Sequence, residues 1–267
     1  AGAIPHRQAG AVVLNHPGLN AYAMLQKPRD AYILLNAEPA DFANAHLAQE
    51  SFKQAKCVIA LSMYRDPLLE TYADVILPVA PFTETSGTFV NAAGLWQSFT
   101  GVATGYANSR PAWKVLRVLA NFLQINGFDY ESSEAVKHEV KALVDKMPAL
   151  TPAAFQPNKT AQKTHLSRIG ETPVYAIDSI TRHSKPLQDV QTIMEGDVAA
   201  VRMHTETAKK LHIQDGDIVN VKQAHASAKL LAKLDDRIAR DAAWIASGIP
   251  ETSGLGDLFG DVEIEKG

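Results

Sequence analysis

The chain has 267 residues, of which 46% are hydrophobic and 21% charged, and its formal net charge at pH 7 is −3. This length suits two domains, and the small negative charge without a run of lysines or arginines excludes a broad basic surface for nucleic acid. The single cysteine, Cys57, excludes an internal disulfide framework and an iron–sulfur cluster, which needs about four cysteine ligands. We expect no direct membrane insertion, because no stretch of about 18 residues is continuously apolar. The chain starts like a loop and without a methionine, so we also expect it to be part of a longer polypeptide.

The first half of the chain, residues 1–147, is predicted to be an α/β domain. Residues 31–36 and 57–62 are short apolar runs typical of buried strands, and a helix is expected from about residue 44 between them. A strand, a helix and a second strand within about thirty residues form a βαβ unit, which requires parallel strands. Residues 73–78 add a third strand, so the pattern predicts a parallel, Rossmann-like sheet.

Two helices are expected after the sheet. The first runs from about Pro111 to Asn126 with Ser109 as its cap, and its polar residues form one narrow stripe. A helix with so broad an apolar surface should be mostly buried. The second helix begins at about Ser133.

The second half of the chain changes character. Residues 148–170 are rich in proline, threonine and glutamine without periodicity, which indicates a linker. Residues 171–267 contain one short helix and several short strands, which are expected over 172–178, 198–204, 214–223, 228–236 and 242–249. This pattern predicts a small closed β-barrel.

A polar stretch, residues 82–99, comes directly after the third strand. Its polar side chains near the start are Glu84, Thr85, Ser86, Thr88 and Asn91. Because open α/β sheets bind ligands beyond the carboxyl ends of their strands, this stretch is a candidate cofactor site, with Gly87 allowing close backbone approach. The alternative is a structural β-hairpin packed between the domains and anchored by Phe89, Trp96 and Phe99, since loops of this composition are common.

Glu38 and Asp41 also follow a strand, the run over 31–36. They could contact a ligand in the same crevice, but capping the next helix or staying solvated is the more common role of such residues. The nine histidines show no metal-binding spacing, so we expect no metal ligands. No nucleophile or phosphate-loop motif predicts a catalytic residue.

The order of several motifs resembles the molybdopterin oxidoreductase superfamily. "YADVILP" is followed by "ETSGTFVN" and "SRPAWKVLRVLA" in the first half, and by "VRMHTETAKKLHIQDGDIVNVK" in the second. Within that superfamily, "EPAD", "ETSGTFVN", "WQSF" and "GFDYES" are similar to the family of G subunits of bacterial NADH-quinone oxidoreductase (respiratory complex I). The resemblance covers nearly the whole chain.

This resemblance implies a fold, a site and a set of cofactors. The small barrel would be the double-psi β-barrel that closes over the pterin dinucleotide in molybdenum enzymes. The pterin-facing loop would consist of Glu84, Ser86, Gly87, Thr88, Asn91 and Gln97. Ala93 and Leu95 stand where the superfamily commonly has a glutamate and an arginine, and leucine cannot replace arginine as a phosphate partner. We therefore expect a vestigial pterin cleft with no cofactor in this part of the chain, and iron–sulfur clusters in a preceding part.

The resemblance also implies a role and a location. The chain would be a scaffold in the peripheral arm of complex I, on the cytoplasmic side of the inner (plasma) membrane, in contact with other peripheral-arm subunits. The parent complex would transfer electrons from NADH to quinone, while this chain would contribute no catalytic residue. The alternative is the C-terminal half of an active molybdenum oxidoreductase that binds molybdopterin dinucleotide. A free-standing protein that binds a nucleotide-like ligand is a third hypothesis.

Overall fold

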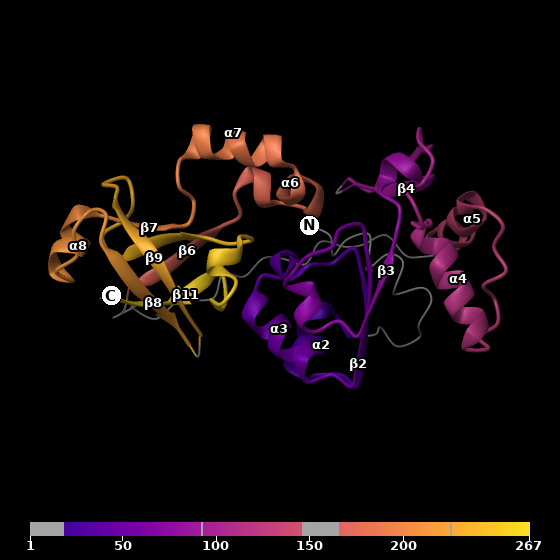
Figure 1. Cartoon of the computed structure of the whole chain (residues 1–267), viewed down its shortest axis with the longest axis horizontal. Coiled ribbons are helices and arrows are strands. Elements are labelled where there is room, and N and C mark those ends of the chain that lie inside the picture. Colours follow the sequence, from indigo (N-terminus) through magenta and orange to yellow (C-terminus); the bar gives the residue numbers. More distant parts are fainter. Residues whose placement is uncertain (1–18, 92, 146–165, 225) are drawn as a thin grey trace.

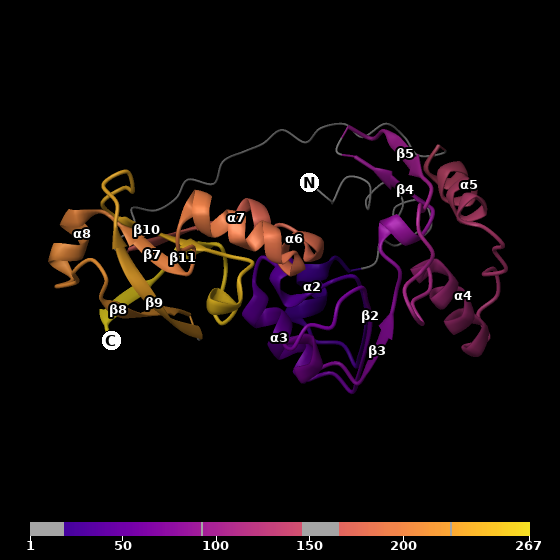
Figure 2. The same cartoon turned by 45° about the horizontal axis from the view of Figure 1, so that its top comes forward.

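The computed structural model describes residues 19–91, 93–145, 166–224 and 226–267, and within these ranges it contains three sheets with helices around them (Figure 1). A curled sheet lies at one end and a parallel sheet in the middle. A two-stranded hairpin with two helices lies at the other end, and a second view shows the same order (Figure 2). Among the described residues, no helix is both long and apolar enough to cross a membrane.

The parallel sheet confirms the predicted βαβ unit. Its strands are β1 (Ala31–Leu35), β2 (Cys57–Ser62) and β3 (Val75–Pro78), in the order β1-β2-β3. The first two are connected by α3 (Ala45–Lys53), which Asn44 caps by accepting a hydrogen bond from the Leu47 amide at 2.8 Å. The rings of Phe52 on α3 and Tyr32 on β1 pack edge to face, 5.0 Å apart, in the core that also receives α2 (Ala21–Gln26).

Three short 3-10 turns follow the three strands at their carboxyl ends. They are η1 (Pro39–Asp41), η2 (Leu69–Thr71) and η3 (Phe82–Glu84). Because parallel strands end at the same edge of a sheet, the loops that contain these turns meet there.

Residues 82–99 contain the structural hairpin. β4 (Gly87–Val90) and β5 (Trp96–Phe99) pair antiparallel, and the rings of Phe89 and Phe99 stack with centroids 5.0 Å apart. However, Phe89 is 62% exposed, so it does not anchor the hairpin between the domains as expected.

The helix α4 (Ala112–Phe122) forms as predicted but is not mostly buried. Ala120 is its one buried residue, and Phe122 is 82% exposed. That expectation is wrong because the apolar surface of α4 exceeds what the described neighbours cover. Its N-cap is Pro111, not Ser109.

The second predicted helix is confirmed as α5 (Ser133–Val144). Ser132 caps it by accepting a hydrogen bond from the Ala135 amide at 3.1 Å. The predicted linker lies outside the described residues up to residue 165, whereas its end forms a strand, because β6 begins at Ser167.

The second half of the chain forms a curled, mixed sheet of seven strands within the described ranges. In chain order these are β6 (Ser167–Glu171), β7 (Ala200–Met203), β8 (Ile218–Gln223), β9 (Ala226–Leu234), β10 (Ala242–Ala246), β11 (Phe259–Asp261) and β12 (Glu263–Lys266). Their spatial order is β11-β6-β10-β7-β9-β8-β12. The predicted short helix is α8 (Thr205–Lys210), and η5 (Pro250–Thr252) follows β10. The double-psi topology stays a prediction.

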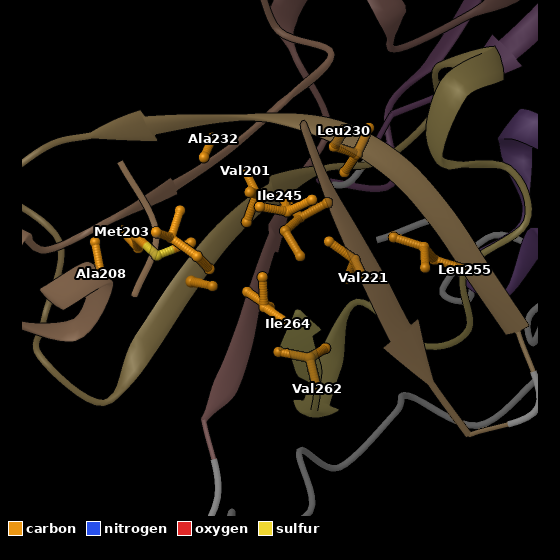
Figure 3. Packing of buried hydrophobic residues seen from close by; sticks show 13 residues of the cluster. Val201, Met203, Ala208, Val221, Leu230, Ala232, Ile245, Leu255, Val262 and Ile264 are labelled. Carbon is orange, nitrogen blue, oxygen red and sulfur yellow. The ribbon is translucent and has the colours of Figure 1, made fainter. Parts of the chain in front are cut away.

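The core of the curled sheet lies inside the curl. Alternate side chains of β7 and β8, such as Val201, Met203 and Val221, point inward together with Ile245 of β10 (Figure 3). All four are fully buried. The strands are therefore held together by a core of their own.

Residues 172–178 are not the strand that the sequence predicted. They contain η4 (Val174–Ala176), followed by two unpredicted helices, α6 (Ser179–His183) and α7 (Lys185–Glu195). The Asp178 side chain accepts a hydrogen bond from the Thr181 amide at 2.8 Å and so starts α6. The extended backbone ends earlier, because Pro173 has no amide hydrogen to donate to a sheet and is the N-cap of η4 shortly after β6.

Candidate functional site

Two cavities lie at the carboxyl edge of the parallel sheet. The first, called here the α6 cavity, has a volume of about 400 Å³ and is lined by Glu38, Asp66 and His183, among others. The second, called the β3 cavity, has a volume of about 460 Å³ and is lined by Tyr64 and Glu84, among others. Both volumes lie within the range of small-molecule sites.

Glu38 is a buried carboxylate at the end of β1, with its side chain 4% exposed. One oxygen lies 3.0 Å from Nη2 of Arg182, and the other lies 3.0 Å from Nε2 of His183. Arg182 also pairs with Asp41 at 2.7 Å and donates to the Ala176 carbonyl at 2.9 Å. A buried charge needs such partners, and here they connect the parallel sheet to α6.

The two acidic residues after β1 have different roles in the structure. Asp41 accepts a hydrogen bond from the Glu38 amide at 2.8 Å, so it caps η1 as the sequence suggested. Glu38 is not solvated, because α6 covers it with a cation and an imidazole.

An aromatic pair lies between the two cavities. The rings of Tyr64 and His183 stack with centroids 4.4 Å apart and planes at 19°. His183 lines the α6 cavity and Tyr64 lines the β3 cavity. Burial raises the pKa of the Tyr64 phenol, and the charges of Glu38 and Asp178 raise it further.

Glu38, Asp66 and His183 also form a set of possible metal ligands. Their ligand atoms all lie within 4.8 Å of one another. Both oxygens of Glu38 already accept hydrogen bonds, however, and Arg182 brings a positive charge to the same carboxylate. That charge disfavours a metal cation at the same position. The absence of metal ligands stays a prediction.

Two polar groups of residues that line the β3 cavity lack hydrogen-bond partners among the described residues. Glu84 accepts one hydrogen bond, from the Tyr106 amide at 2.8 Å, and among the described residues its second carboxylate oxygen has no donor. The hydroxyl of Ser109 is buried, and no described residue is its hydrogen-bond partner. An orphaned buried hydroxyl costs about 1–3 kcal/mol, which a polar ligand would offset.

The structure does not bring the predicted cofactor residues to one cavity. Glu84 lines the β3 cavity, whereas Ser86, Gly87 and Thr88 line a separate cavity of about 330 Å³ between the hairpin and α5. The hydroxyls of Thr88 and Ser98 lie 3.0 Å apart. Contact of these residues with a cofactor stays a prediction.

The last two predicted residues belong to the hairpin itself. Asn91 stabilises the turn, because its side-chain oxygen accepts hydrogen bonds at 3.0 Å from the amides of Ala93 and Leu95. Gln97 is exposed on β5. Their role toward a cofactor is likewise a prediction.

Several residues of the two cavities were not predicted as site residues, among them Tyr64, Ser109, Arg182 and His183. Tyr64 follows β2 closely, so the rule applied to Glu38 after β1 could have identified it. The capping pair Asp178 and Thr181 predicts a helix that carries Arg182 and His183. Their pairing with Glu38, more than a hundred residues earlier in the chain, left no local signal.

Two family models match the chain. Residues 5–122 match the model described as molybdopterin oxidoreductase, which includes the parallel sheet and α4. Residues 176–263 match the model described as "Molydopterin dinucleotide binding domain", which includes α6 and most of the curled sheet.

Individual relatives are more distant. The G subunit of NADH-quinone oxidoreductase from Mycobacterium bovis is 26% identical over 225 residues, covering 80% of this chain and 26% of that protein. The assimilatory nitrate reductase catalytic subunit of Bacillus subtilis is 21% identical, covering 93% of this chain and 42% of that protein. The structure of acetylene hydratase from Pelobacter acetylenicus superposes with a TM-score of 0.60 at 16% identity, covering 98% of this chain and 46% of that one. The chain thus spans less than half the length of each.

The matches correct one expectation. The sequence was expected to hold no cofactor in this part of the chain, on the basis of Ala93 and Leu95. That expectation is wrong, because residues 176–263 match the dinucleotide-binding domain.

Proposed function

Because this chain belongs to the molybdopterin oxidoreductase superfamily, we propose that it binds a molybdopterin dinucleotide as part of a larger oxidoreductase. The cofactor would supply the redox chemistry when bound. The chain's own residues would bind and orient one end of it and exclude water there.

The β3 cavity fits a ring of this cofactor. Pterin and guanine share an aminopyrimidinone ring, whose neighbouring N–H and NH₂ donors suit a carboxylate oxygen. Glu84 offers that oxygen, and Tyr64 offers an aromatic wall. The observation that carries the proposal is that Ser109, whose buried hydroxyl has no partner among the described residues, lines this cavity together with Glu84.

The pyrophosphate of the cofactor needs other partners. Arg182 is already paired with Glu38 and Asp41, so its charge is neutralised at the α6 cavity. The proposal therefore places only a ring of the dinucleotide against the residues described here.

Calorimetric titration with guanosine monophosphate tests this placement. We expect binding, weaker binding of adenosine monophosphate, and about tenfold loss of affinity in Glu84→Gln, because the amide presents a donor to the ring's donors. The matched control is Glu70→Gln, whose carboxylate pairs with Arg65 outside the β3 cavity. Equal binding of both nucleotides, or unchanged binding by Glu84→Gln, would overturn the placement.

A second role is favoured by the similarity to the mycobacterial G subunit over 80% of the chain. In this role the chain would be a scaffold in the peripheral arm of complex I, at the cytoplasmic face of the membrane, with other peripheral-arm subunits as partners. Affinity purification of the full-length protein from its host distinguishes the roles. Co-purification of NADH–quinone oxidoreductase activity supports the scaffold, whereas molybdenum-dependent reductase activity without it supports a catalytic subunit.

We also propose two domains for the fold. The first is the α/β domain of residues 1–147, and the second is a double-psi β-barrel. The linker predicted over residues 148–170 would end before Ser167, because β6 starts there.

A further inference from the structure

We propose that Glu38 is a positioning residue for the β3 cavity, which it does not line: through His183, it fixes the ring of Tyr64 that forms the wall of that cavity. This inference rests on the proposed function, because it assigns the Tyr64 ring a ligand to face.

The backbone of Tyr64 is held locally, but its ring is not. Ser62 fixes the backbone on both sides: its hydroxyl donates to the Tyr64 carbonyl at 2.7 Å and accepts from the Tyr64 amide at 3.2 Å. For the phenol group, no hydrogen-bond partner is found within the part of the chain that the structure covers. The ring of His183 stacks on the Tyr64 ring, with centroids 4.4 Å apart and planes at 19°, and so limits its orientation.

His183 is oriented in turn by Glu38. Its Nε2 lies 3.0 Å from Oε1 of Glu38, and Arg182 holds the other oxygen with Nε at 3.1 Å and Nη2 at 3.0 Å. The carboxylate is almost fully buried, so solvent does not compete for it. Glu38 thus holds the imidazole of His183 in place against the ring of Tyr64.

A carboxylate can accept hydrogen bonds from both partners at once. Arg182 donates to one oxygen of Glu38, and Nε2 of His183 lies against the other. Glutamine has the same shape but carries NH₂ on one arm, so with its oxygen toward Arg182 it presents a donor to His183 and requires the imidazole proton on Nδ1. Glu38→Gln should therefore replace the charge-assisted hydrogen bond to His183 by a weaker neutral one and loosen the hold on its ring.

The first measurement follows the phenol of Tyr64 by alkaline difference absorbance, as the wild-type signal minus that of Tyr64→Phe. Glu38 contributes to the raised pKa of Tyr64, so Glu38→Gln should lower that pKa. Glu50→Gln is the matched control, because Glu50 forms an exposed surface pair with Lys53. The control should leave the pKa of Tyr64 unchanged.

The second measurement is the affinity for guanosine monophosphate in the full chain. We expect Glu38→Gln and His183→Asn each to weaken binding about tenfold, although Glu38 does not line the β3 cavity. His183→Asn keeps the pairing of Glu38 with Arg182, so it separates ring positioning from loss of the buried ion pair. Circular dichroism verifies that the variants are folded.

The outcomes separate the two proposals. Unchanged affinity in both folded variants, with the wild type binding guanosine monophosphate, overturns the positioning role and leaves the proposed function in place. A lowered pKa of Tyr64 in Glu38→Gln verifies only that the charge of Glu38 reaches the ring, because that charge acts whether or not His183 is fixed. If the wild type binds no guanosine monophosphate, the proposed function fails, and the positioning role, which rests on it, fails with it.

Discussion

The curled sheet and the unit formed by the hairpin, α4 and α5 treat their apolar residues in opposite ways. The curled sheet closes over Val201, Met203 and Ile245, which are completely buried. In α4, by contrast, Phe122 is 82% exposed and Val118 is 48% exposed. An apolar segment therefore becomes core in this chain only where neighbouring elements cover it, as in the curled sheet, and not where it faces outward, as in α4. Substitutions in the two regions should therefore have very different effects.

The largest effect is expected for Ile245→Ala in β10. Ile245 is fully buried in the core of the curled sheet, so its truncation leaves a cavity. We expect a loss of about 3–4 kcal/mol in the free energy of unfolding, measured by chemical denaturation. A loss below about 1 kcal/mol would mean that the curl can collapse around the cavity, and the contrast with α4 would weaken.

A smaller loss is expected for Arg168→Met in β6. Arg168 is 2% exposed, and it donates to the Gln223 side chain at 3.0 Å and to the Ala246 and Gly256 carbonyls at 3.2 Å. Burial lowers the pKa of this guanidinium to about 10. Methionine removes the buried charge but leaves the acceptors without donors, so we expect a loss of about 2–3 kcal/mol.

Arg240→Met is the matched control for this variant. Arg240 is exposed on the same domain, and its truncation should change the free energy of unfolding by less than about 0.5 kcal/mol. Equal losses of unfolding free energy in the two variants would show that the buried hydrogen bonds of Arg168 do not stabilise the curled sheet.

The pairing of Asp235 with Arg237 gives a pH-dependent effect on the same sheet. Hydrogen bonds from the Arg237 side chain and amide lower the pKa of Asp235 to about 2. Because the folded pKa is below that of the unfolded chain, the contribution is complete above about pH 5 and is lost as pH falls toward 2. The difference in unfolding free energy between wild type and Asp235→Asn should therefore shrink between these pH values. A difference that stays constant would show that the charge is not responsible.

The smallest effect is expected for Phe122→Ala in α4. Truncation of an exposed side chain removes few packing contacts, so the free energy of unfolding should change by less than about 0.5 kcal/mol. Thermal or chemical denaturation measures this. A loss comparable to that of Ile245→Ala would mean that α4 is covered in solution. Its apolar residues would then be core in the same way as those of the curled sheet.

The fold was predictable where the sequence pattern is local. β1, β2 and β3 are apolar runs with a capped helix between the first two, and all of them form. The helices α6 and α7 were missed because the apolar run before Asp178 was interpreted as a strand. The wide apolar face of α4 gave no information about what covers it.

The candidate site was predictable only in part. Glu84 was identified because it follows a strand, whereas the pairing of Glu38 with Arg182 depends on tertiary structure. The wrong expectation about the cofactor came from Ala93 and Leu95. The structure places both at the exposed tip of the hairpin, where their side chains do not line the β3 cavity.

The strand order of the curled sheet has a consequence for how the chain is made. β6 is the first strand of this sheet to leave the ribosome, yet its neighbours are β10 and β11. Those strands, residues 242–246 and 259–261, are synthesised after β7, β8 and β9. During translation the backbone amides and carbonyls of β6 therefore stay unpaired until β10 has emerged. Until then they can pair with wrong strands. The sheet should therefore close late, once β10 and β11 are available to pair with β6.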